Sequence, residues 1–220
     1  MTISFFQASP DIIKPYALMD LDDTLFQTQR KIDAWNLPTS KAENLVCASV
    51  NKQGEPLSFM SQRQASFVNW LLTSTELIVV TARDREEIKR VRLPFDSWQV
   101  LTHGAIVLTQ DGKLDTQWQQ RMYGKLAPLQ EKLGQLSQLF TQHSSSDNSH
   151  LKFTAHTDHF NNGTENKELT IYLAIKHAQK NHQALIQLAE QLPKLIRNFD
   201  QDFYVHVNAN NLAILPHAVH

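Results

Sequence analysis

A short apolar segment that ends in a cluster of acids limits the possible folds of this chain most strongly. Residues Tyr16 to Asp20 read Y-A-L-M-D, and Asp22 and Asp23 follow directly. Such a near-continuous apolar run suits a strand that is buried within a parallel sheet. Because ligands of open α/β sheets bind beyond the carboxyl ends of the strands, the acids lie where a site is expected. The sequence therefore predicts an α/β fold with its chemistry at Asp20 and Asp22.

A second apolar run, residues 77–80, ends in Thr81 and repeats this arrangement. Helical spacing predicts a helix before it, over 61–74 with Ser61 as a candidate cap, and another after it, over 85–92. Two further short strands are predicted at 98–101 and 105–108. Strands that alternate with helices favour a parallel sheet, so the first hundred residues are predicted to be α/β.

The pattern changes after about Thr109 to long periodic helices and alternating strands. The predicted domains are a core over 1–108, an α+β cap over 109–215, and the start of a return to the core over 216–220. Within the core, two β-prone stretches over about 45–59 suit a hairpin that acts as a flap. The elements predicted for the cap are helices over 123–140 and 182–199, a polar loop over 144–149, and strands over 151–157, 169–175, 203–207 and 212–215.

The acids after the first strand have the composition of a phosphoryl-transfer site. Asp20 and Asp22 are two residues apart, so one carboxylate can attack phosphorus and form an acyl phosphate while the other moves a proton. Oxygen donors gathered here also suit Mg²⁺, which one or two carboxylates and phosphate oxygens commonly hold. The alternative is a capped turn, because Asp and Thr are favoured wherever a strand meets a loop.

Thr81 adds a second half to this site, because a hydroxyl before a helix N-terminus forms a phosphate pocket with backbone N–H groups and the helix dipole. Together the motifs resemble the haloacid dehalogenase superfamily of phosphatases. Its first motif is an apolar strand that ends Asp-x-Asp-x-Thr, as at Asp20, Asp22 and Thr24, and its second is one that ends in Thr or Ser. Thr-Ala-Arg at 81–83 and His-Gly-Ala at 103–105 are similar to the Thr-Gly-Arg and Asn-Gly-Ala pair of the branch that includes sucrose-phosphate phosphatase.

The resemblance implies a Rossmann-like parallel core with an inserted α+β cap that has an open antiparallel sheet. It implies that Asp20 is the nucleophile, Asp22 the general acid and base, and Thr81 the phosphate clamp. Ala82 and Leu21 are further candidates for phosphate binding. Mg²⁺ would be held by the carboxylate of Asp20 and the backbone carbonyl of Asp22.

The sequence departs from this family in several places. Ala82 stands where the branch has Gly, and His103 where it has Asn. The third motif is a Lys after the last cap strand and the fourth a pair of acids on another core strand; neither is present as written, and the chain reads P-H-A-V-H over 216–220. The core sheet is therefore expected to be incomplete at its C-terminal side, which would leave the strand before Asp20 as an exposed edge. A truncated chain, a partner that supplies the edge, and a degenerate protein that binds phosphate weakly all remain open.

The polar face of the predicted cap sheet supplies substrate candidates. If the apolar residues of the cap strands pack under the two helices, the alternate residues point away, and their hydroxyls, imidazoles and rings can recognise a sugar. Open antiparallel sheets also have a polar face when they bind nothing. The residues predicted on this face are Lys152, Thr154, His156, Thr170, Tyr172, Tyr204 and His206. The substrate candidates are Arg83, His156, Tyr172 and His206.

Charge and composition exclude several other classes of protein. A formal net charge of -1 and a pI of about 6.8 give no positive field to attract nucleic-acid phosphates. Cys47 is the single cysteine and the N-terminus lacks a secretory signal, so a cytoplasmic location is expected. No apolar run approaches the roughly 20 residues of a membrane span. His150, His156, Asp158 and His159 match no firm zinc signature.

The function predicted from these residues is a Mg²⁺-dependent phosphatase that hydrolyses a small phosphorylated metabolite, a sugar phosphate in particular, through an aspartyl-phosphate on Asp20. The partner is then a small molecule rather than nucleic acid or membrane, and the sequence predicts no oligomeric state. The competing hypothesis is a catalytically impaired or truncated protein that binds phosphorylated ligands without efficient turnover. Transfer of the phosphoryl group to a sugar hydroxyl is a third option that the sequence does not separate from hydrolysis.

Overall fold

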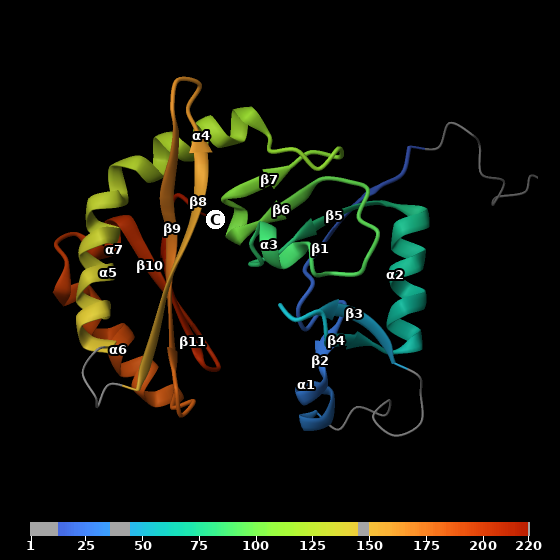
Figure 1. Cartoon of the computed structure of the whole chain (residues 1–220), viewed down its shortest axis with the longest axis horizontal. Coiled ribbons are helices and arrows are strands. Elements are labelled where there is room, and N and C mark those ends of the chain that lie inside the picture. The colour runs from blue at the N-terminus through green and yellow to red at the C-terminus, as the bar shows by residue number, and fades with distance from the viewer. Residues whose placement is uncertain (1–12, 36–44, 145–149, 220) are drawn as a thin grey trace, which may run out of the picture. The chain divides into compact units, whose positions relative to one another are not determined.

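The computed structural model describes residues 13–35, 45–144 and 150–219. The backbone divides into two compact units. The first consists of Met1–Leu101 and Leu108–Lys113, and the second of Thr102–Val107 and Leu114–His220. Figure 1 shows the elements of both, although it does not determine how the units are placed relative to one another.

A parallel sheet organises the first unit. Its parallel strands are β1 (Tyr16–Met19), β5 (Glu76–Val80) and β6 (Gln99–Leu101). The strand β7 (Ile106–Leu108), of which only Leu108 belongs to the first unit, is the fourth in the order β1-β5-β6-β7. Strand β5 pairs in parallel with both β1 and β6. The helix α2 (Gln62–Ser74) runs directly into β5, and α3 (Arg85–Ile88) follows it. The predicted α/β class is therefore confirmed. The prediction that β1 is buried is wrong: among the described residues β1 is an edge strand, and its Tyr16 and Leu18 are exposed.

The helix α2 begins at a capping box that the sequence predicted only as a cap. The Ser61 Oγ accepts a hydrogen bond from the backbone N–H of Gln64 at 3.2 Å, and the Gln64 Oε1 accepts one from the backbone N–H of Ser61 at 2.9 Å. Both groups would otherwise lack partners in the first turn of a helix. The buried Val68 and Leu71 fix the inner face of this helix.

We expect Ser61→Ala to lower the free energy of unfolding by about 1 kcal/mol, because the part-buried backbone N–H of Gln64 loses its acceptor. Urea denaturation followed by circular dichroism measures the change. Ser66→Ala is the matched control, since Ser66 is exposed on the same helix and its hydroxyl donates only to the Gln62 carbonyl. An equal loss in both variants would contradict the capping role.

A small antiparallel sheet completes the first unit. The predicted hairpin is present as β3 (Val46–Val50) and β4 (Pro56–Met60), and β2 (Gln27–Thr28) pairs with β4, giving the order β2-β4-β3. The turn is held by Asn51, whose Oδ1 accepts from the backbone N–H groups of Gln53 at 2.9 Å and Glu55 at 3.0 Å. Gly54 takes a φ of 84°, which a residue without a side chain adopts at little cost. The short helix α1 (Gln29–Ala34) follows β2.

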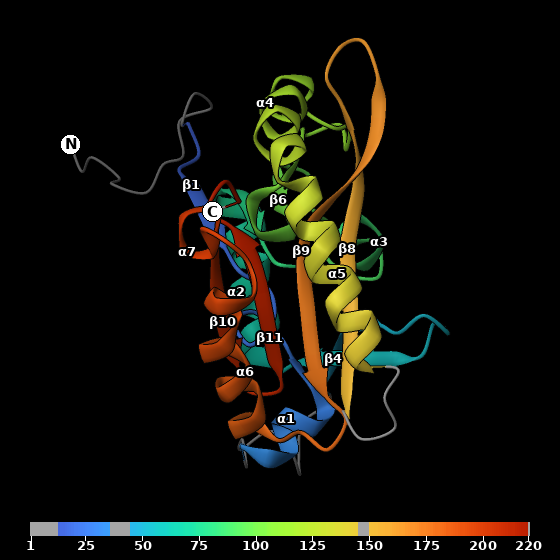
Figure 2. The ribbon, with the colours of Figure 1, turned by 90° about the vertical axis from the view of Figure 1, so that its left-hand side faces the viewer.

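An open antiparallel sheet organises the second unit, as predicted. Its strands are β8 (Leu151–Asn161), β9 (Asn166–His177), β10 (Phe203–Asn208) and β11 (Asn211–Pro216), in the order β10-β11-β9-β8. Helices α5 (Gln130–Ser144) and α6 (His182–Leu195) cover one face of this sheet (Figures 1 and 2). The core between them contains Leu133, Leu136, Phe140, Leu173, Ile175, Leu185, Leu192, Phe203, Leu212 and Ile214.

The predicted helix 123–140 is in fact two helices. The first, α4 (Thr116–Leu126), begins earlier because the Asp115 carboxylate accepts from the backbone N–H of Trp118 at 2.7 Å. A 3₁₀ turn, Ala127–Leu129, separates it from α5, and this turn contains Pro128, which has no N–H to continue an α-helix.

None of the helices in the described ranges combines the length and apolar content that a membrane crossing requires.

Two other predicted helices are too long. The helix predicted over 182–199 ends at Leu195, soon after Pro193, and α7 (Phe199–Asp202) follows separately. The helix predicted over 85–92 ends at Ile88, because the next residues bond to β3 instead: the Arg92 N–H donates to the Ala48 carbonyl at 2.7 Å. The predicted loop at 144–149 lies outside the described residues except for Ser144, which ends α5.

Candidate active site

The two motifs predicted from the sequence lie at the same edge of the parallel sheet. The register of β1 and β5 pairs Met19 with Val79, so Asp20 and Thr81 follow the ends of neighbouring strands. Asp20 is exposed, whereas the Thr81 residue is only 5% exposed. This is the edge at which open α/β sheets bind ligands.

The segment after β1 folds into a tight turn that holds Asp20 at the surface. The Leu21 carbonyl accepts from the N–H of Leu25 at 2.9 Å, and Asp23 takes a left-handed φ of 65°. Leu21 and Leu25 are buried and anchor the turn below. Above it, the Thr24 hydroxyl donates to the Asp20 Oδ2 at 3.2 Å. One carboxylate oxygen of Asp20 is thereby oriented by a neutral donor, and the side chain faces solvent.

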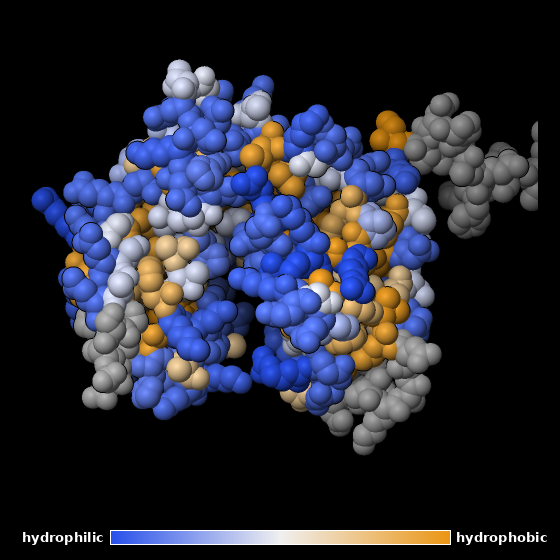
Figure 3. All heavy atoms as spheres, viewed as in Figure 1, coloured by the Kyte–Doolittle hydropathy of each residue, from blue (hydrophilic) through white to orange (hydrophobic). Residues whose placement is uncertain are grey.

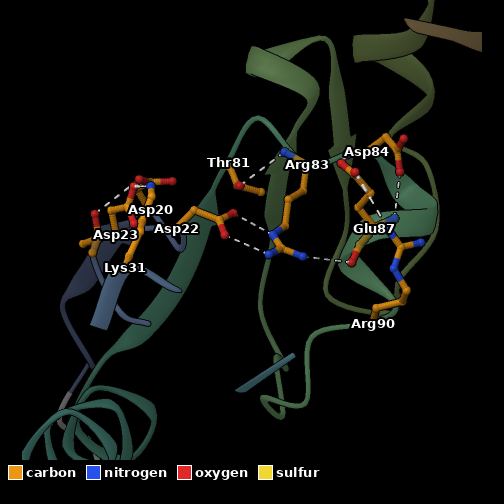
Figure 4. A network of polar contacts seen from close by, with 10 residues as sticks. Asp20, Asp22, Asp23, Lys31, Thr81, Arg83, Asp84, Glu87 and Arg90 are labelled. Atoms are coloured by element: carbon orange, nitrogen blue, oxygen red, sulfur yellow. Dashed lines mark hydrogen bonds and ion pairs between the residues drawn. The ribbon is translucent and has the colours of Figure 1, made fainter. Parts of the chain in front are cut away.

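Arg83 holds Asp22 through two hydrogen bonds (Figure 4). The Arg83 Nε donates to the Asp22 Oδ2 at 2.7 Å, and the Nη2 donates to the Oδ1 at 2.8 Å. Burial by itself would lower the pKa of Arg83, but the hydrogen bond and negative charge of Asp22 outweigh it, so this pKa is raised. The guanidinium also lies 5.4 Å from the centre of the Phe26 ring. This paired, charge-assisted arrangement fixes the orientation of the Asp22 carboxylate, because both of its oxygens accept from the guanidinium.

The sequence singled out Arg83 beside Thr81 but did not identify Asp22 as its partner. The sequence does contain a signal for this pair. Asp22 lies three positions after Met19, the last residue of β1, and Arg83 lies three positions after Val80, the last residue of β5. Because those strands are neighbours, opposite charges at equal offsets are brought together. Their side chains meet across 61 positions of sequence.

A second layer of polar contacts surrounds this pair (Figure 4). Asp23 forms an ion pair with Lys31 of α1. The carboxylate of Asp84 accepts from the N–H of Glu87 at 2.7 Å, while the Arg83 Nη1 donates to the Glu87 carbonyl at 3.5 Å. The helix α3, from which a dipole was expected, has four residues and is capped by Asp84. Its dipole therefore adds little to phosphate binding.

The predicted phosphate ligands differ in exposure. The Thr81 Oγ1 accepts from the N–H of Arg83 at 3.3 Å, and its own N–H donates to the Val100 carbonyl at 2.9 Å. Leu21 is fully buried, so only its backbone can contribute, whereas Ala82 is exposed. Contact of these residues with phosphate stays a prediction.

The substrate candidates of the second unit share one face of its sheet. His156 and Tyr172 are cross-strand partners of β8 and β9, and their rings stack at 4.2 Å between centroids with 5° between planes. The sequence did not identify a third member, His103, whose ring meets that of Tyr172 edge-on at 5.0 Å. Tyr172 is only 6% exposed, so most of its ring is covered. His206 is exposed on β10, two strands away from β9.

The oxygen donors of the first unit are compatible with a hard cation. Asp20 is an exposed carboxylate, and Asp22 adds a backbone carbonyl in the same turn. Within the described residues no group of three or more His, Cys, Asp or Glu side chains is arranged to hold a metal. Mg²⁺ commonly takes only one or two carboxylates and completes its shell with water and phosphate oxygens. The donor set therefore fits Mg²⁺ bound together with a phosphate group.

The sequence matches no family model and no curated protein. The backbone is similar to several solved structures. They include sucrose-phosphatase from Synechocystis sp., with 13% identity, a TM-score of 0.49, and coverage of 95% of this chain and 66% of that one. The C-terminal domain of trehalose-6-phosphate phosphatase from C. albicans shows 13% identity, a TM-score of 0.48, and coverage of 94% and 58%. A haloacid dehalogenase-like hydrolase from Bacteroides thetaiotaomicron shows 11% identity, a TM-score of 0.46, and coverage of 94% and 72%.

One of these neighbours is described as a haloacid dehalogenase-like hydrolase. This chain spans 66% of the length of the Synechocystis sucrose-phosphatase and 58% of the Candida domain. The likeness concerns the backbone alone, and the function is therefore argued below from the residues of this chain.

Proposed function

We propose that this protein is a phosphoric monoester hydrolase of the haloacid dehalogenase type that acts on a small phosphorylated metabolite, a sugar phosphate in particular. The observation that supports this function best is that the exposed Asp20 carboxylate follows β1 and the Thr81 hydroxyl follows the neighbouring parallel strand β5. A nucleophile and a phosphate-binding hydroxyl on neighbouring strands are the parts that this reaction requires.

Asp20 is the nucleophile of the proposed reaction. An oxygen of its carboxylate forms a bond to phosphorus, and the bond from phosphorus to the substrate oxygen breaks, so that an acyl phosphate and an alkoxide result. Thr24 donates to the Oδ2 of this carboxylate, which leaves the Oδ1 for attack. Water then attacks the acyl phosphate, releases inorganic phosphate and restores the Asp20 carboxylate.

Asp22 is the proposed general acid for the leaving oxygen and the general base for water. Its pairing with Arg83 opposes both roles, because both carboxylate oxygens already accept hydrogen bonds from the guanidinium and neither is free for the substrate or water. Phosphate offers Arg83 a second bidentate partner of greater charge. We therefore propose that Arg83 turns from Asp22 to the bound phosphate, which frees Asp22 to exchange protons with the substrate.

Mg²⁺ is the proposed metal, held by the Asp20 carboxylate and the Asp22 backbone carbonyl. When bound, it would offset the negative charge of the phosphoryl group that Asp20 approaches. Thr81 and Arg83 supply donors to the same group from the β5 side. The three groups together compensate charge that would otherwise repel an anionic nucleophile.

Release of inorganic phosphate from a panel of sugar phosphates and an aryl phosphate, with and without Mg²⁺, tests this function. We expect metal-dependent release, with sugar phosphates among the substrates. Circular dichroism of the same sample establishes that the protein is folded. If the folded protein releases no phosphate from any compound of the panel, the proposed hydrolase activity is contradicted.

The Arg83 and Asp22 pair supports a second candidate, a protein that binds phosphorylated ligands without efficient turnover. In that case Asp22 stays bonded to Arg83, and the site binds phosphate without a group that is free to transfer a proton. Calorimetric titration with inorganic phosphate, combined with the release assay, distinguishes the hydrolase from the binding protein. The binding protein alone is expected to bind phosphate, to bind it more weakly in Thr81→Val, and to release no phosphate from any substrate of the panel. Thr73→Val is the control, because Thr73 is exposed on α2.

A further inference from the structure

Three consecutive residues after β6 have left-handed backbone conformations. Thr102, His103 and Gly104 have φ values of 51°, 55° and 90°. Glycine adopts such angles at little cost and His more readily than most residues, but a β-branched residue such as Thr is a rare outlier there. Thr102 is also only 2% exposed, and among the described residues its Oγ1 is buried without a hydrogen-bond partner. The fold therefore retains a turn that costs stability through both its backbone and this hydroxyl.

This turn is fixed by contacts with α4 and β9, within the second unit. The Trp118 Nε1 of α4 donates a hydrogen bond to the Gly104 carbonyl at 2.9 Å. The ring of His103 meets the edge or face of Tyr172 at a right angle, and His156 stacks on the same tyrosine. His103 is therefore held by the turn that carries it and by the ring of Tyr172.

The turn stands at the carboxyl end of a parallel strand. Leu101 ends β6, which pairs in parallel with β5, and Thr102 is the next residue of the chain. Asp20 and Thr81 occupy the corresponding places after β1 and β5. Ligands of open α/β sheets bind at these strand ends, and strained residues that a fold retains gather at binding sites. The strain at Thr102 therefore indicates a role for this turn in ligand binding.

We propose that His103 is a specificity-determining residue that binds the hydroxyl-bearing part of a phosphorylated sugar, and that the strained turn positions it. This inference rests on the proposed function. A neutral imidazole donates a hydrogen bond through one ring nitrogen and accepts one through the other, so it can bind sugar hydroxyls. Tyr172 is a positioning residue, because it is only 6% exposed and its ring contacts that of His103. In Figure 3 hydrophilic residues cover most of the visible surface of the second unit, which suits a polar ligand.

His103→Asn tests the specificity. Asn adopts a left-handed φ readily, so the turn is retained while the imidazole is removed. We expect the ratio of kcat/KM for the best sugar phosphate of the panel to kcat/KM for the aryl phosphate to fall about tenfold, through KM of the sugar phosphate. The affinity for inorganic phosphate, measured by calorimetry, should not change, because Thr81 and Arg83 are the proposed phosphate ligands. His159→Asn is the matched control, because His159 is exposed on β8 of the same unit.

The outcomes separate this inference from the proposed function. If the unaltered protein releases phosphate and the ratio is the same in His103→Asn, the role of His103 is overturned while the proposed function stands. An equal fall of the ratio in His159→Asn overturns that role too. An unaltered protein that releases no phosphate contradicts the proposed function, and the inference falls with it.

Thr102→Gly and Thr102→Ala test the strain of the turn. Both remove the hydroxyl and the branched side chain, so the difference between them is the Cβ that disfavours a φ of 51°. We expect Thr102→Gly to melt about 2 to 4 °C above Thr102→Ala by circular dichroism, yet to lose more of the preference for sugar phosphates, because a freer turn no longer fixes His103. A turn with a purely structural role predicts that the more stable variant is at least as selective. That result, or a higher melting temperature for Thr102→Ala, overturns the positioning by strain.

Discussion

Asp20→Asn is expected to lower the rate of phosphate release by at least about 10³-fold, because an amide oxygen is a poor nucleophile toward phosphorus. The substitution keeps the size of the side chain and an oxygen that can accept from Thr24. The fold should therefore persist while the reaction is lost. Release from the best substrate of the panel, measured at saturating Mg²⁺, gives the change.

Asp23→Asn is the matched control for this experiment. Asp23 is also an exposed acid of the same turn, but its carboxylate is paired with Lys31. Its left-handed φ of 65° is one that Asn adopts readily, so the turn is retained. We expect Asp23→Asn to keep most of the activity. Unchanged turnover in Asp20→Asn would refute Asp20 as the nucleophile, and equal losses in both would assign the effect to the charge of the turn.

Asp22→Asn is expected to lower kcat by roughly 10² to 10⁴-fold on sugar phosphates, because the leaving alkoxide then receives no proton. An aryl phosphate has a leaving group that departs more easily as an anion, so its hydrolysis should lose less. The ratio of the two losses is therefore the informative measurement. A general acid predicts unequal losses, whereas a residue that only shapes the turn predicts equal ones.

Arg83→Gln separates proton transfer by Asp22 from its role as the partner of Arg83. If Asp22 acted only by holding the guanidinium, Arg83→Gln would reproduce the effect of Asp22→Asn, and the double variant would lose no more. We expect instead that Arg83→Gln raises KM, since Arg83 is the proposed phosphate ligand. The preference for aryl leaving groups should appear only when Asp22 is replaced. An unchanged KM in Arg83→Gln, together with a preference for aryl leaving groups in that variant, would contradict the proposal that Arg83 turns from Asp22 to the bound phosphate.

Hydrophobic periodicity was enough to predict most strands of this protein. The run that became β5 is buried at alternate positions, whereas β1, which was predicted to be buried, has Tyr16 and Leu18 exposed. The sequences of β8 and β10 alternate because one face of their sheet lies under helices. Helix ends were predicted less well. Pro128 and Pro193 interrupt patterns that otherwise continue, and the residues after Ile88 exchange helical hydrogen bonds for bonds to β3.

The sequence alone determined that Asp20 and Thr81 follow the carboxyl ends of two strands, and because these strands are parallel neighbours both residues lie at the same end of the sheet. Tertiary structure decided the pairing of Asp22 with Arg83 and the stack of His156 on Tyr172. Both contacts join residues that are distant in the chain, and they depend on the path of a turn or on the register of two strands. Periodicity reports which side of an element is buried, whereas side-chain partners are fixed only when the elements pack.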